Sequence, residues 1–484
     1  MRLDHIALEI EGARLYGDPG TEVTALRYDN RQVGPGDAFF CVAGLEADGH
    51  DFAPAAVEAG AVALISERRL DAGVAELVVP DSRAAMAPAA AAFNGDPTAD
   101  LKVAGITGTN GKTTTAFLLR DILEYAGLPT GLMGTVKQIV GGAEEEVVRT
   151  TPEAVDLQQT FGRMAEAGDE ACVIEVSSHA LVMHRCDAID FDLAVFTNLT
   201  QDHLDFHADM DDYFAAKRLL FEAGPGSSVV NIDDPYGRRL AVEFEVFTFS
   251  ANGAAADYSA TEVKFDASGA DFLVESEHGD LVVHTPLPGR FNVANAIAAL
   301  AGAITLGVEP DEAVAALADA GRVPGRFEPI DEGQDFTVLV DYAHTPDSVE
   351  NALRAARDLT EGRLIAIVGA GGDRDRAKRP LMGRAGAELA DLTIVTSDNP
   401  RSEDPAEIIN DVLEGIAERQ EVEVEPDRSA AIARAVEVAA PGDTVVIAGK
   451  GHEQGQEFEN GRKIPFDDRE VARTHLRRVG GRSG

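Results

Sequence analysis

The sequence predicts an α/β protein of three domains, a small N-terminal domain followed by two larger ones. Its 484 residues are too many for one ordinary core. Short apolar runs alternate with helical patterns along most of the chain, as in mostly parallel sheets covered by helices. The loop signal at Asn94–Pro97 ends the first domain. We place the domains at residues 1–99, 100–326 and 327–484.

Composition excludes several kinds of partner and location. The net charge of −42, from 84 acidic and 42 basic residues, argues against binding nucleic acid or inserting into an anionic membrane. Acid-rich usage fits either a saline cytoplasm or a GC-rich genome. The first residues form no signal peptide, and no apolar run is long enough to span a membrane. Cys41, Cys172 and Cys186 have no paired spacing and read as small buried residues in a reducing compartment. We therefore expect a cytoplasmic protein.

The N-terminal domain reads as a small α/β unit. Strands are expected at Ala38–Val42, Ala61–Ile65 and Glu76–Val79, with alanine-rich helices between them. The Asp29–Arg31 segment, followed by Gly34–Asp37, has the chemistry of turns.

The central domain begins with a strand, a tight loop and a helix over Val103–Thr115. Gly108 and Gly111 precede Lys112 and Thr113. Such a loop directs backbone N–H groups at phosphate oxygens, while a lysine reaches outer phosphates and a threonine hydroxyl can ligate Mg²⁺. The usual glycine five positions before Gly111 is Ile106, so the loop departs from the common pattern.

The rest of this domain continues the alternation, with one interruption. Buried strands are expected at Ala171–Val176 and Leu193–Asn198. Residues alternate in polarity within Phe247–Thr285, which predicts an antiparallel hairpin or small sheet, and a helix follows at Phe291–Ile304.

The C-terminal domain is predicted to be a second open, Rossmann-like sheet. Its expected strands alternate with helical stretches and lie at Thr337–Val340, Leu364–Val368, Leu392–Val395 and Thr444–Ala448.

Polar residues follow the buried central strands, where open α/β sheets collect ligands. Glu175 ends one strand, and Asn198–His207 follows the next with two histidines and two aspartates. A hard cation held by Glu175 and His203 fits better than zinc, because the cysteines are far in sequence from Asn198–His207 and its two histidines do not sit within an obvious four-ligand set. Lys217 would by itself be read as a surface lysine.

Four segments occur in the order found in one enzyme family: Gly108–Thr113, Glu175–His179, Asn198–His207 and Ala215–Phe221. The chain resembles the Mur ligases, to which folylpolyglutamate synthase is related. The resemblance implies ATP as cosubstrate and two Mg²⁺ ions, with Lys217 carbamylated so that it supplies oxygen to the second ion. It continues through Gly289–Asn295, Gly325–Arg326 and Asp341–His344.

By this resemblance, three sets of residues are assigned. Lys112, Lys217, His203 and Arg326 are catalytic. The metal ligands are Thr113, Glu175, His203 and Lys217. ATP is bound by Gly108, Thr109, Asn110, Gly111, Lys112, Thr113, Thr114, Asn292, Asn295, Arg326 and Asp341.

The segment Thr396–Arg401 resembles the motif by which one member of the family recognises meso-diaminopimelate. Arg401 would grip a carboxylate with two hydrogen bonds, and Glu453 would bind an ammonium group. The implied acceptor pocket comprises Arg374, Asp398, Asn399, Pro400, Arg401, Gly449 and Glu453.

The resemblance also implies contacts with UDP-N-acetylmuramoyl-L-alanyl-D-glutamate. They are Asn30, Thr150, Thr151, Ser177 and Arg185. Four positions depart from the family pattern: Asn30 stands for serine, Leu45 and Glu46 for a His-Gln pair, and Met183 for glutamine.

The implied reaction is ATP-dependent amide ligation of meso-diaminopimelate to that dipeptide through an acyl phosphate, by a monomer whose partners are small molecules. Two alternatives remain open. One is a related ligase with a different acceptor, such as a folylpolyglutamate-type enzyme, and the other is a non-catalytic nucleotide-binding subunit.

Overall fold

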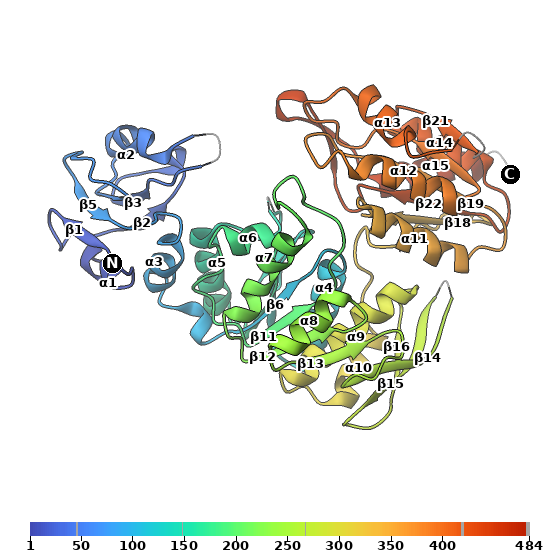
Figure 1. Cartoon of the computed structure of the whole chain (residues 1–484), viewed down its shortest axis with the longest axis horizontal. Helices are drawn as coiled ribbons and strands as arrows, with labels where there is room; N and C mark the ends of the chain where they lie inside the picture. Colours follow the sequence, from blue (N-terminus) through green and yellow to red (C-terminus); the bar gives the residue numbers. More distant parts are fainter. Residues whose placement is uncertain (45–46, 148, 267, 418–420, 481–484) are drawn as a thin grey trace. The chain divides into compact units, whose positions relative to one another are not determined.

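The computed structural model describes residues 1–44, 47–147, 149–266, 268–417 and 421–480 (Figure 1). Leu45 and Glu46 lie outside these ranges. The chain divides into two compact units, each assembled from several segments. The first comprises residues 1–107, 127–194 and 216–228, and the second comprises residues 108–126, 195–215 and 229–484.

The first unit begins with a five-stranded sheet in the order β1-β5-β4-β3-β2. Strands β2 to β5 are parallel, while β1 runs antiparallel to β5. Leu3, Ile6 and the alanines of α3 cover one face of this sheet. The elements are α1 (Leu3–Leu8), β1 (Arg14–Tyr16), β2 (Ala25–Arg27), β3 (Asp37–Phe40), α2 (Ala53–Ala59), β4 (Ala63–Ser66), β5 (Ala75–Val78) and α3 (Met86–Phe93).

The same unit contains strands in the order β6-β10-β7-β8-β9. Strand β10 is parallel to both β6 and β7, and β8 and β9 add an antiparallel meander. Ala154 and Val155, at the start of α5, pack into the core of the N-terminal sheet. The elements are β6 (Lys102–Thr107), β7 (Thr130–Met133), β8 (Gln138–Val140), β9 (Ala143–Glu145), α5 (Ala154–Ala167), β10 (Ala171–Glu175) and α6 (Ser178–Val182).

The second unit contains most of β12 and all of β13 to β16, hydrogen-bonded in sequence order. Pairing is parallel from β12 to β14 and antiparallel from β14 to β16. Helices α4 and α10 each pack against α9. The elements are α4 (Lys112–Tyr125), β12 (Ser227–Asn231), α8 (Pro235–Glu243), β13 (Phe247–Ser250), β14 (Tyr258–Asp266), β15 (Gly269–Ser276), β16 (Leu281–Thr285), α9 (Arg290–Thr305) and α10 (Pro310–Ala318). Strand β11 (Leu193–Phe196) and helix α7 (Met210–Glu222), like β12, carry residues of both units.

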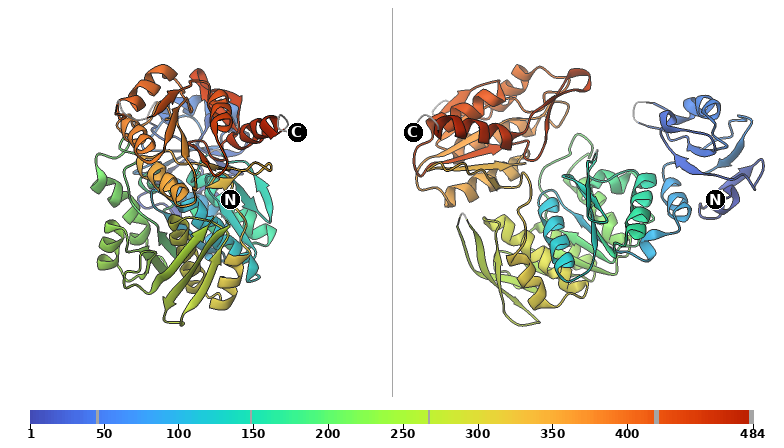
Figure 2. Two further views of the ribbon diagram at one scale, coloured as in Figure 1. Left: turned by 90° about the vertical axis from the view of Figure 1, so that its right-hand side faces the viewer. Right: turned by 180° about the vertical axis from the view of Figure 1, so that it is seen from behind.

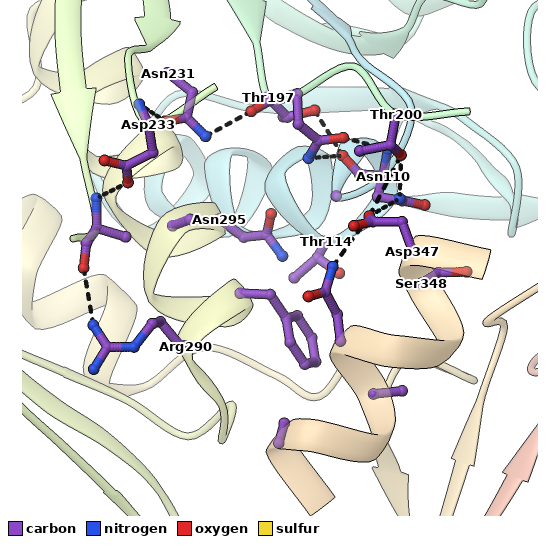
Figure 3. A pocket seen from close by; sticks show the side chains of 18 of the residues that line it. Asn110, Thr114, Thr197, Thr200, Asn231, Asp233, Arg290, Asn295, Asp347 and Ser348 are labelled. Carbon is purple, nitrogen blue, oxygen red and sulfur yellow. Dashed lines mark hydrogen bonds between the residues drawn. The ribbon is translucent and has the colours of Figure 1, made fainter. Parts of the chain in front are cut away.

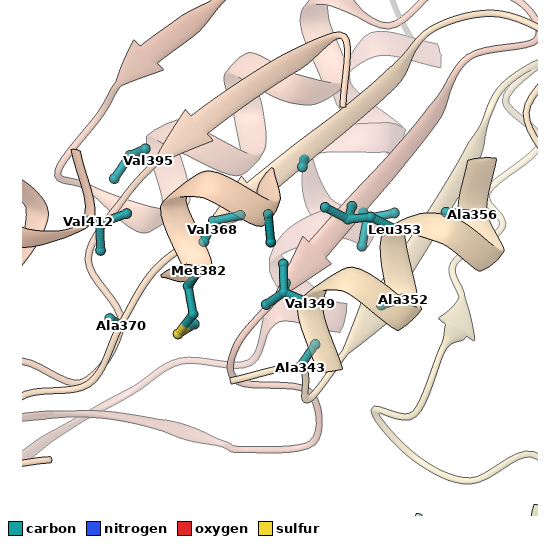
Figure 4. Packing of buried hydrophobic residues seen from close by; sticks show 14 of the residues in the cluster. Ala343, Val349, Ala352, Leu353, Ala356, Val368, Ala370, Met382, Val395 and Val412 are labelled. Carbon is teal, nitrogen blue, oxygen red and sulfur yellow. The ribbon is translucent and has the colours of Figure 1, made fainter. Parts of the chain in front are cut away.

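The C-terminal part of the second unit is a three-layer α/β/α structure around a six-stranded sheet, β17-β18-β22-β19-β20-β21 (Figure 2). All pairs are parallel except β17 with β18. Ala366 and Val368 of β19 pack in the core covered by α11 to α13, whereas Ile365 and Ile367 pack in the core covered by α14 and α15. Figure 4 shows Val368 in the first of these cores. This alternation buries both faces of the sheet.

The elements of this part are β17 (Glu328–Pro329), β18 (Thr337–Asp341), α11 (Pro346–Asp358), β19 (Leu364–Val368), α12 (Lys378–Leu389), β20 (Leu392–Val395), α13 (Pro405–Leu413), β21 (Val422–Val424), α14 (Arg428–Val438), β22 (Thr444–Ala448), β23 (Gly455–Phe458), β24 (Arg462–Pro465) and α15 (Asp468–Gly480).

The predicted fold class is confirmed, since helices alternate with mostly parallel strands in all three sequence regions. The predicted hairpin is also present as β14, β15 and β16. The domain boundaries stay a prediction. All three cysteines are buried and free. None of the helices in the described ranges has the length and hydropathy to span a membrane.

Candidate active site

The phosphate loop joins the end of β6 at Thr107 to the start of α4 at Lys112. Gly108 and Gly111 have φ values of 148° and 87°. A Cβ atom on Gly108 would overlap Oγ1 of Thr197, and one on Gly111 would overlap Oδ1 of Asn295. Both the backbone conformation and the close approach therefore require glycine.

The loop is held by hydrogen bonds on two sides. Lys112 Nζ donates to the carbonyl oxygens of Gly108 and Thr109, each at 2.9 Å. Asn198 accepts from Asn110 N at 2.9 Å and donates from Nδ2 to Asn110 O at 3.0 Å. The backbone of the loop is thereby fixed before a ligand arrives, which lowers the entropic cost of binding.

A cavity of about 570 Å³ opens beside this loop in the second unit (Figure 3). Its size suits a nucleotide, because ligand pockets typically measure about 300–1,000 Å³. Among the predicted ATP residues, it is lined by Asn110, Gly111, Thr114, Asn295, Arg326 and Asp341. Asn292 is buried behind them, accepting from Asn295 Nδ2 at 3.1 Å.

Several lining residues were not predicted from the sequence. Asn231 is the last residue of β12, Asp233 follows that strand, and Arg290 begins α9. Figure 3 shows that Asn231 donates to Thr197 O, while Arg290 Nη1 donates to Ala251 O at 3.4 Å. The signal was present in the sequence, because Asn231 and Asp233 lie at the carboxyl end of a strand and Arg290 lies inside a recognised motif.

Asp347, in the first turn of α11, also lines the cavity. Its Oδ2 accepts from Asn110 Nδ2 at 2.9 Å, from Thr200 Oγ1 at 3.4 Å and from Asn351 Nδ2 at 3.1 Å. Burial raises the pKa of Asp347, although the bond from Asn110 opposes this. One carboxylate thus ties the phosphate loop to the C-terminal sheet.

Arg326 also lines the cavity. Its Nη2 donates to Thr113 Oγ1 at 2.9 Å, and its guanidinium carbon lies 4.5 Å from the centroid of the Tyr342 ring. Asp341 Oδ2 accepts from Phe327 N at 2.7 Å. Burial raises the pKa of Asp341 to about 6, while the charge of Arg326 acts in the opposite direction.

In the first unit, most residues predicted to contact the sugar dipeptide gather around the end of β10. Thr151 Oγ1 donates to Glu175 O at 2.8 Å and accepts from Ser177 N at 3.1 Å. Arg185 Nη1 donates to Thr151 O at 3.0 Å. Thr150 Oγ1 lies 3.1 Å from Thr135 Oγ1. The structure therefore brings Thr150, Thr151, Ser177 and Arg185 together.

The charges in this cluster include one buried carboxylate shared by three arginines. Glu153 lies 2.8 Å from Arg185, 2.6 Å from Arg149 and 3.4 Å from Arg83.

Asn30 begins a short 3₁₀ helix over Asn30–Gln32, capped by Asp29. Met183 Sδ accepts from Arg185 Nη2 at 3.5 Å.

The predicted metal ligands divide between the units: Glu175 and Lys217 belong to the first, Thr113 and His203 to the second. Glu175 Oε1 and Oε2 accept from Thr135 N and Oγ1 at 2.8 and 3.0 Å. Lys217 is 1% exposed. In the described part of the chain, no three His, Cys, Asp or Glu residues cluster as metal ligands would. Of the predicted ligands, only Glu175 and His203 belong to these four residue types. The oxygen donors of the predicted set suit Mg²⁺.

The predicted acceptor residues meet in the second unit between the turn after β20 and the loop after β22. Arg401 has a φ of 50°, unusual for a residue with a side chain. Its Nε donates to Glu457 Oε2 at 3.2 Å and its Nη1 to Gly372 O at 2.7 Å. Arg374, on the loop that carries Gly372, is exposed and donates to Asp373 O at 3.0 Å.

Asn399 and Glu453 contact each other directly. Asn399 Nδ2 donates to Glu453 Oε2 at 2.7 Å. Asp398 is buried, and a Cβ on Gly449 would overlap its Oδ2. Burial raises the pKa of Asp398, but Lys450 and Arg428 together hold it below its ordinary value. The structure thus brings Asp398, Asn399, Gly449 and Glu453 together, while their role as an acceptor pocket stays a prediction.

Comparison with known proteins identifies the family of the chain. Residues 106–303 match the Mur ligase middle domain, residues 325–451 the Mur ligase glutamate ligase domain, and residues 22–94 the Mur ligase family catalytic domain. A UDP-N-acetylmuramoyl-L-alanyl-D-glutamate–2,6-diaminopimelate ligase from Streptomyces coelicolor is 48% identical, covering 96% of this chain and 94% of that protein. The chain belongs to the Mur ligase family.

Other Mur ligases extend the comparison. The ligase of the same description from Syntrophomonas wolfei is 46% identical over 94% of this chain and 95% of its own length. A solved structure with that description superposes with a TM-score of 0.70 at 33% identity, covering 99% of both chains. A MurF ligase from Thermotoga maritima in complex with ADP has a TM-score of 0.65 at 20% identity, covering 95% of this chain and 97% of that one, and shares the fold.

Proposed function

We propose that this Mur ligase joins meso-diaminopimelate to UDP-N-acetylmuramoyl-L-alanyl-D-glutamate at the expense of ATP, in the synthesis of the peptidoglycan precursor. Its products are the tripeptide, ADP and phosphate. The observation that carries the proposal is Arg401: a guanidinium fixed by Glu457 and Gly372 beside the Asn399–Glu453 pair suits an amino acid that carries both a carboxylate and an ammonium group.

In the first step, a γ-carboxylate oxygen of the D-glutamyl residue attacks the γ-phosphorus of ATP. The bond to the bridging oxygen breaks, ADP leaves and an acyl phosphate forms. We assign the neutralisation of phosphate charge to Lys112, and to Arg326, whose Nη2 contacts Thr113 in the first turn of α4. Cationic donors are most effective when they are already placed where negative charge develops.

In the second step, the neutral amine of diaminopimelate attacks the acyl carbon. A tetrahedral intermediate forms and collapses, phosphate leaves, and the nitrogen gives up a proton as the amide is completed. The protein needs no covalent nucleophile, because the acyl phosphate is already activated. Its role is to hold the amine near the acyl carbon and to exclude water, which would otherwise hydrolyse the intermediate.

ATP and Mg²⁺ are general requirements of the Mur ligase family. Bound Mg²⁺ supplies positive charge that stabilises the phosphate oxygens. We propose Thr113, Glu175, His203 and Lys217 as ligands for two ions. Lys217 is 1% exposed, and its amine, once deprotonated, can add CO₂ to give a carbamate and a proton. A carbamate signal in ¹³C NMR after ¹³C-bicarbonate labelling, absent in Lys217→Arg, tests this modification.

We assign dipeptide binding to Asn30, Thr150, Thr151, Ser177 and Arg185. The last four share one hydrogen-bonded cluster with Glu175. ATP and a UDP-sugar as substrates place the proposed reaction in the cytoplasm. The chain is proposed to act as a monomer, which light scattering of the purified protein checks.

The deciding experiment measures phosphate release with ATP, Mg²⁺ and the UDP-sugar dipeptide, adding meso-diaminopimelate, L-lysine or no amino acid. Release that depends on diaminopimelate, with formation of the tripeptide, supports the proposal. Equal or faster release with lysine identifies a ligase with another acceptor. ATP binding without release under any condition identifies a non-catalytic nucleotide-binding protein.

A further inference from the structure

Lys450 is a buried cation at the centre of the predicted acceptor pocket. It follows β22 and has an exposed fraction of 0%. Its Nζ donates to Asn399 Oδ1 and to Glu453 Oε2, both at 2.8 Å, and lies 3.8 Å from Asp398 Oδ1. Burying an ammonium group is costly, so this lysine needs all of these partners.

The position of Lys450 fixes the orientation of the Asn399 amide. Asn399 Oδ1 accepts from Lys450 and also from Glu457 N at 3.0 Å. The opposite end of the amide, Nδ2, must therefore face Glu453, to which it donates at 2.7 Å. A flipped amide would place Nδ2 against two donors. The lysine thus decides which group of Asn399 meets the neighbouring carboxylate.

The same contacts leave the two oxygens of Glu453 unequal. Oε2 accepts from both Lys450 and Asn399, whereas Oε1 accepts no hydrogen bond from the described residues. The side chain of Glu453 is 29% exposed, and that of Lys450 is fully buried. One carboxylate oxygen is anchored to the protein, and the other remains for a ligand.

The nearby cations Arg428 and Arg401 have partners other than Glu453. Arg428 is also buried, but Asp468 engages its Nε at 2.8 Å and its Nη2 at 2.6 Å. Arg401 directs Nε and Nη1 to Glu457 and Gly372. Lys450 is therefore the cation in direct contact with Glu453. Its removal would leave less positive charge to offset the repulsion between the carboxylates of Glu453 and Asp398.

We propose that Lys450 is a positioning residue for acceptor recognition: it holds Asn399 and Glu453 as one rigid pair, with Glu453 Oε1 presented to an ammonium group of the amino acid. This inference rests on the proposed function and adds a residue to it. Lys450 acts through its two partners and does not itself touch the substrate.

The test compares Lys450→Met and Lys450→Gln with the parent enzyme in steady-state phosphate release, varying each substrate in turn. Loss of a charged hydrogen bond costs about 1.5–3 kcal/mol, so we expect KM for diaminopimelate to rise about 10–100-fold. KM for ATP and for the UDP-sugar dipeptide should stay within about twofold. Glutamine retains a donor without the charge, so its defect should be the smaller.

A matched control separates positioning from general destabilisation. Val436→Ala removes buried volume from the cluster under α14, away from the acceptor residues. It should lower the melting temperature without changing KM for diaminopimelate. Glu453→Gln combined with Lys450→Met should be far from additive, because both changes disrupt the same pair.

The outcomes are distinguishable. If the parent enzyme releases no phosphate with diaminopimelate, the proposed function fails. If the parent is active and a folded Lys450 variant keeps its KM for diaminopimelate, the positioning role is wrong. It is also wrong if KM rises equally for all three substrates. Should Lys450→Met not fold, Lys450→Gln decides by the same criterion, and failure of both to fold would show a structural role instead.

Discussion

Arg326 donates a hydrogen bond from Nη2 to Oγ1 of Thr113 over 2.9 Å, joining residues 213 positions apart in the chain. The guanidinium also lies over the Tyr342 ring, and that ring is 5.0 Å from the His452 ring, centroid to centroid. His452 is next to Glu453 in sequence. A short series of side chains thus runs from the phosphate loop toward the predicted acceptor pocket.

Replacing Arg326 by lysine should lower kcat by about 100-fold, the usual effect of removing one well-placed donor to a developing negative charge. Lysine keeps the charge but loses the planar group that contacts both Thr113 and Tyr342. Steady-state phosphate release measures the effect. The exposed Arg322→Lys serves as the control. Equal kcat values in the two variants would contradict the assigned role.

Replacing Gly111 by alanine should abolish ATP binding. The new methyl group would overlap Asn295 Oδ1, and φ is 87°. Gly127→Ala is the matched control, since Gly127 has a φ of 79° but nothing within 4 Å of its Cβ position. It bears only the backbone strain, about 1 kcal/mol. Calorimetric titration with ATP should show binding for the Gly127 variant alone.

Replacing Arg401 by lysine should lower kcat/KM for diaminopimelate by about 100-fold, because one ammonium group cannot maintain the contacts with Glu457 and Gly372 and also bind a carboxylate. Phosphate release with varied diaminopimelate measures this. Arg434→Lys, which alters an exposed pair with Glu423, should have no effect. If the Arg401 variant discriminated between diaminopimelate and lysine as well as the parent does, the assignment of Arg401 to the acceptor site would be wrong.

Asp341 should contribute to the pH dependence of stability. Its folded-state pKa is about 6, above the ordinary value of 3.8, so between these values the folded state holds a proton that the unfolded chain has released. The contribution of Asp341 to stability therefore falls as pH rises from about 4 to 6. The difference in melting temperature, parent minus Asp341→Asn, should decrease over this interval and then level off. A difference that rises with pH would show the opposite shift.

The net charge of −42 should make the protein more stable in salt. Self-repulsion among carboxylates is screened as the Debye length falls from about 10 Å at 0.1 M to about 3 Å at 1 M. We expect the melting temperature to rise over this range of KCl. NaCl should act similarly, because screening depends on ionic strength. A flat or falling curve would show that repulsion is not a significant cost.

The sequence predicted most strands of the fold because buried parallel strands are continuous apolar runs bounded by loop signals. It also predicted the phosphate loop, since Gly108, Gly111 and Lys112 are adjacent in the chain. Asp347 was missed because its partner Asn110 lies 237 positions away, and only tertiary packing brings them together. Glu457 was missed for the same reason: nothing near it in sequence indicates that Arg401 will be its partner.

The close contact between the loop that carries Lys450 and the loop that carries Gly325 limits how this site can change. Gly451 has a φ of 54°, and a Cβ there would lie 2.6 Å from Gly325 O and 2.8 Å from Tyr342 Cβ. Neither loop can shift without displacing the other. New amino-acid preferences are therefore accessible to evolution, or to a protein engineer, through side chains such as Arg401 and Glu457, while the main chain that carries Lys450 must be inherited unaltered.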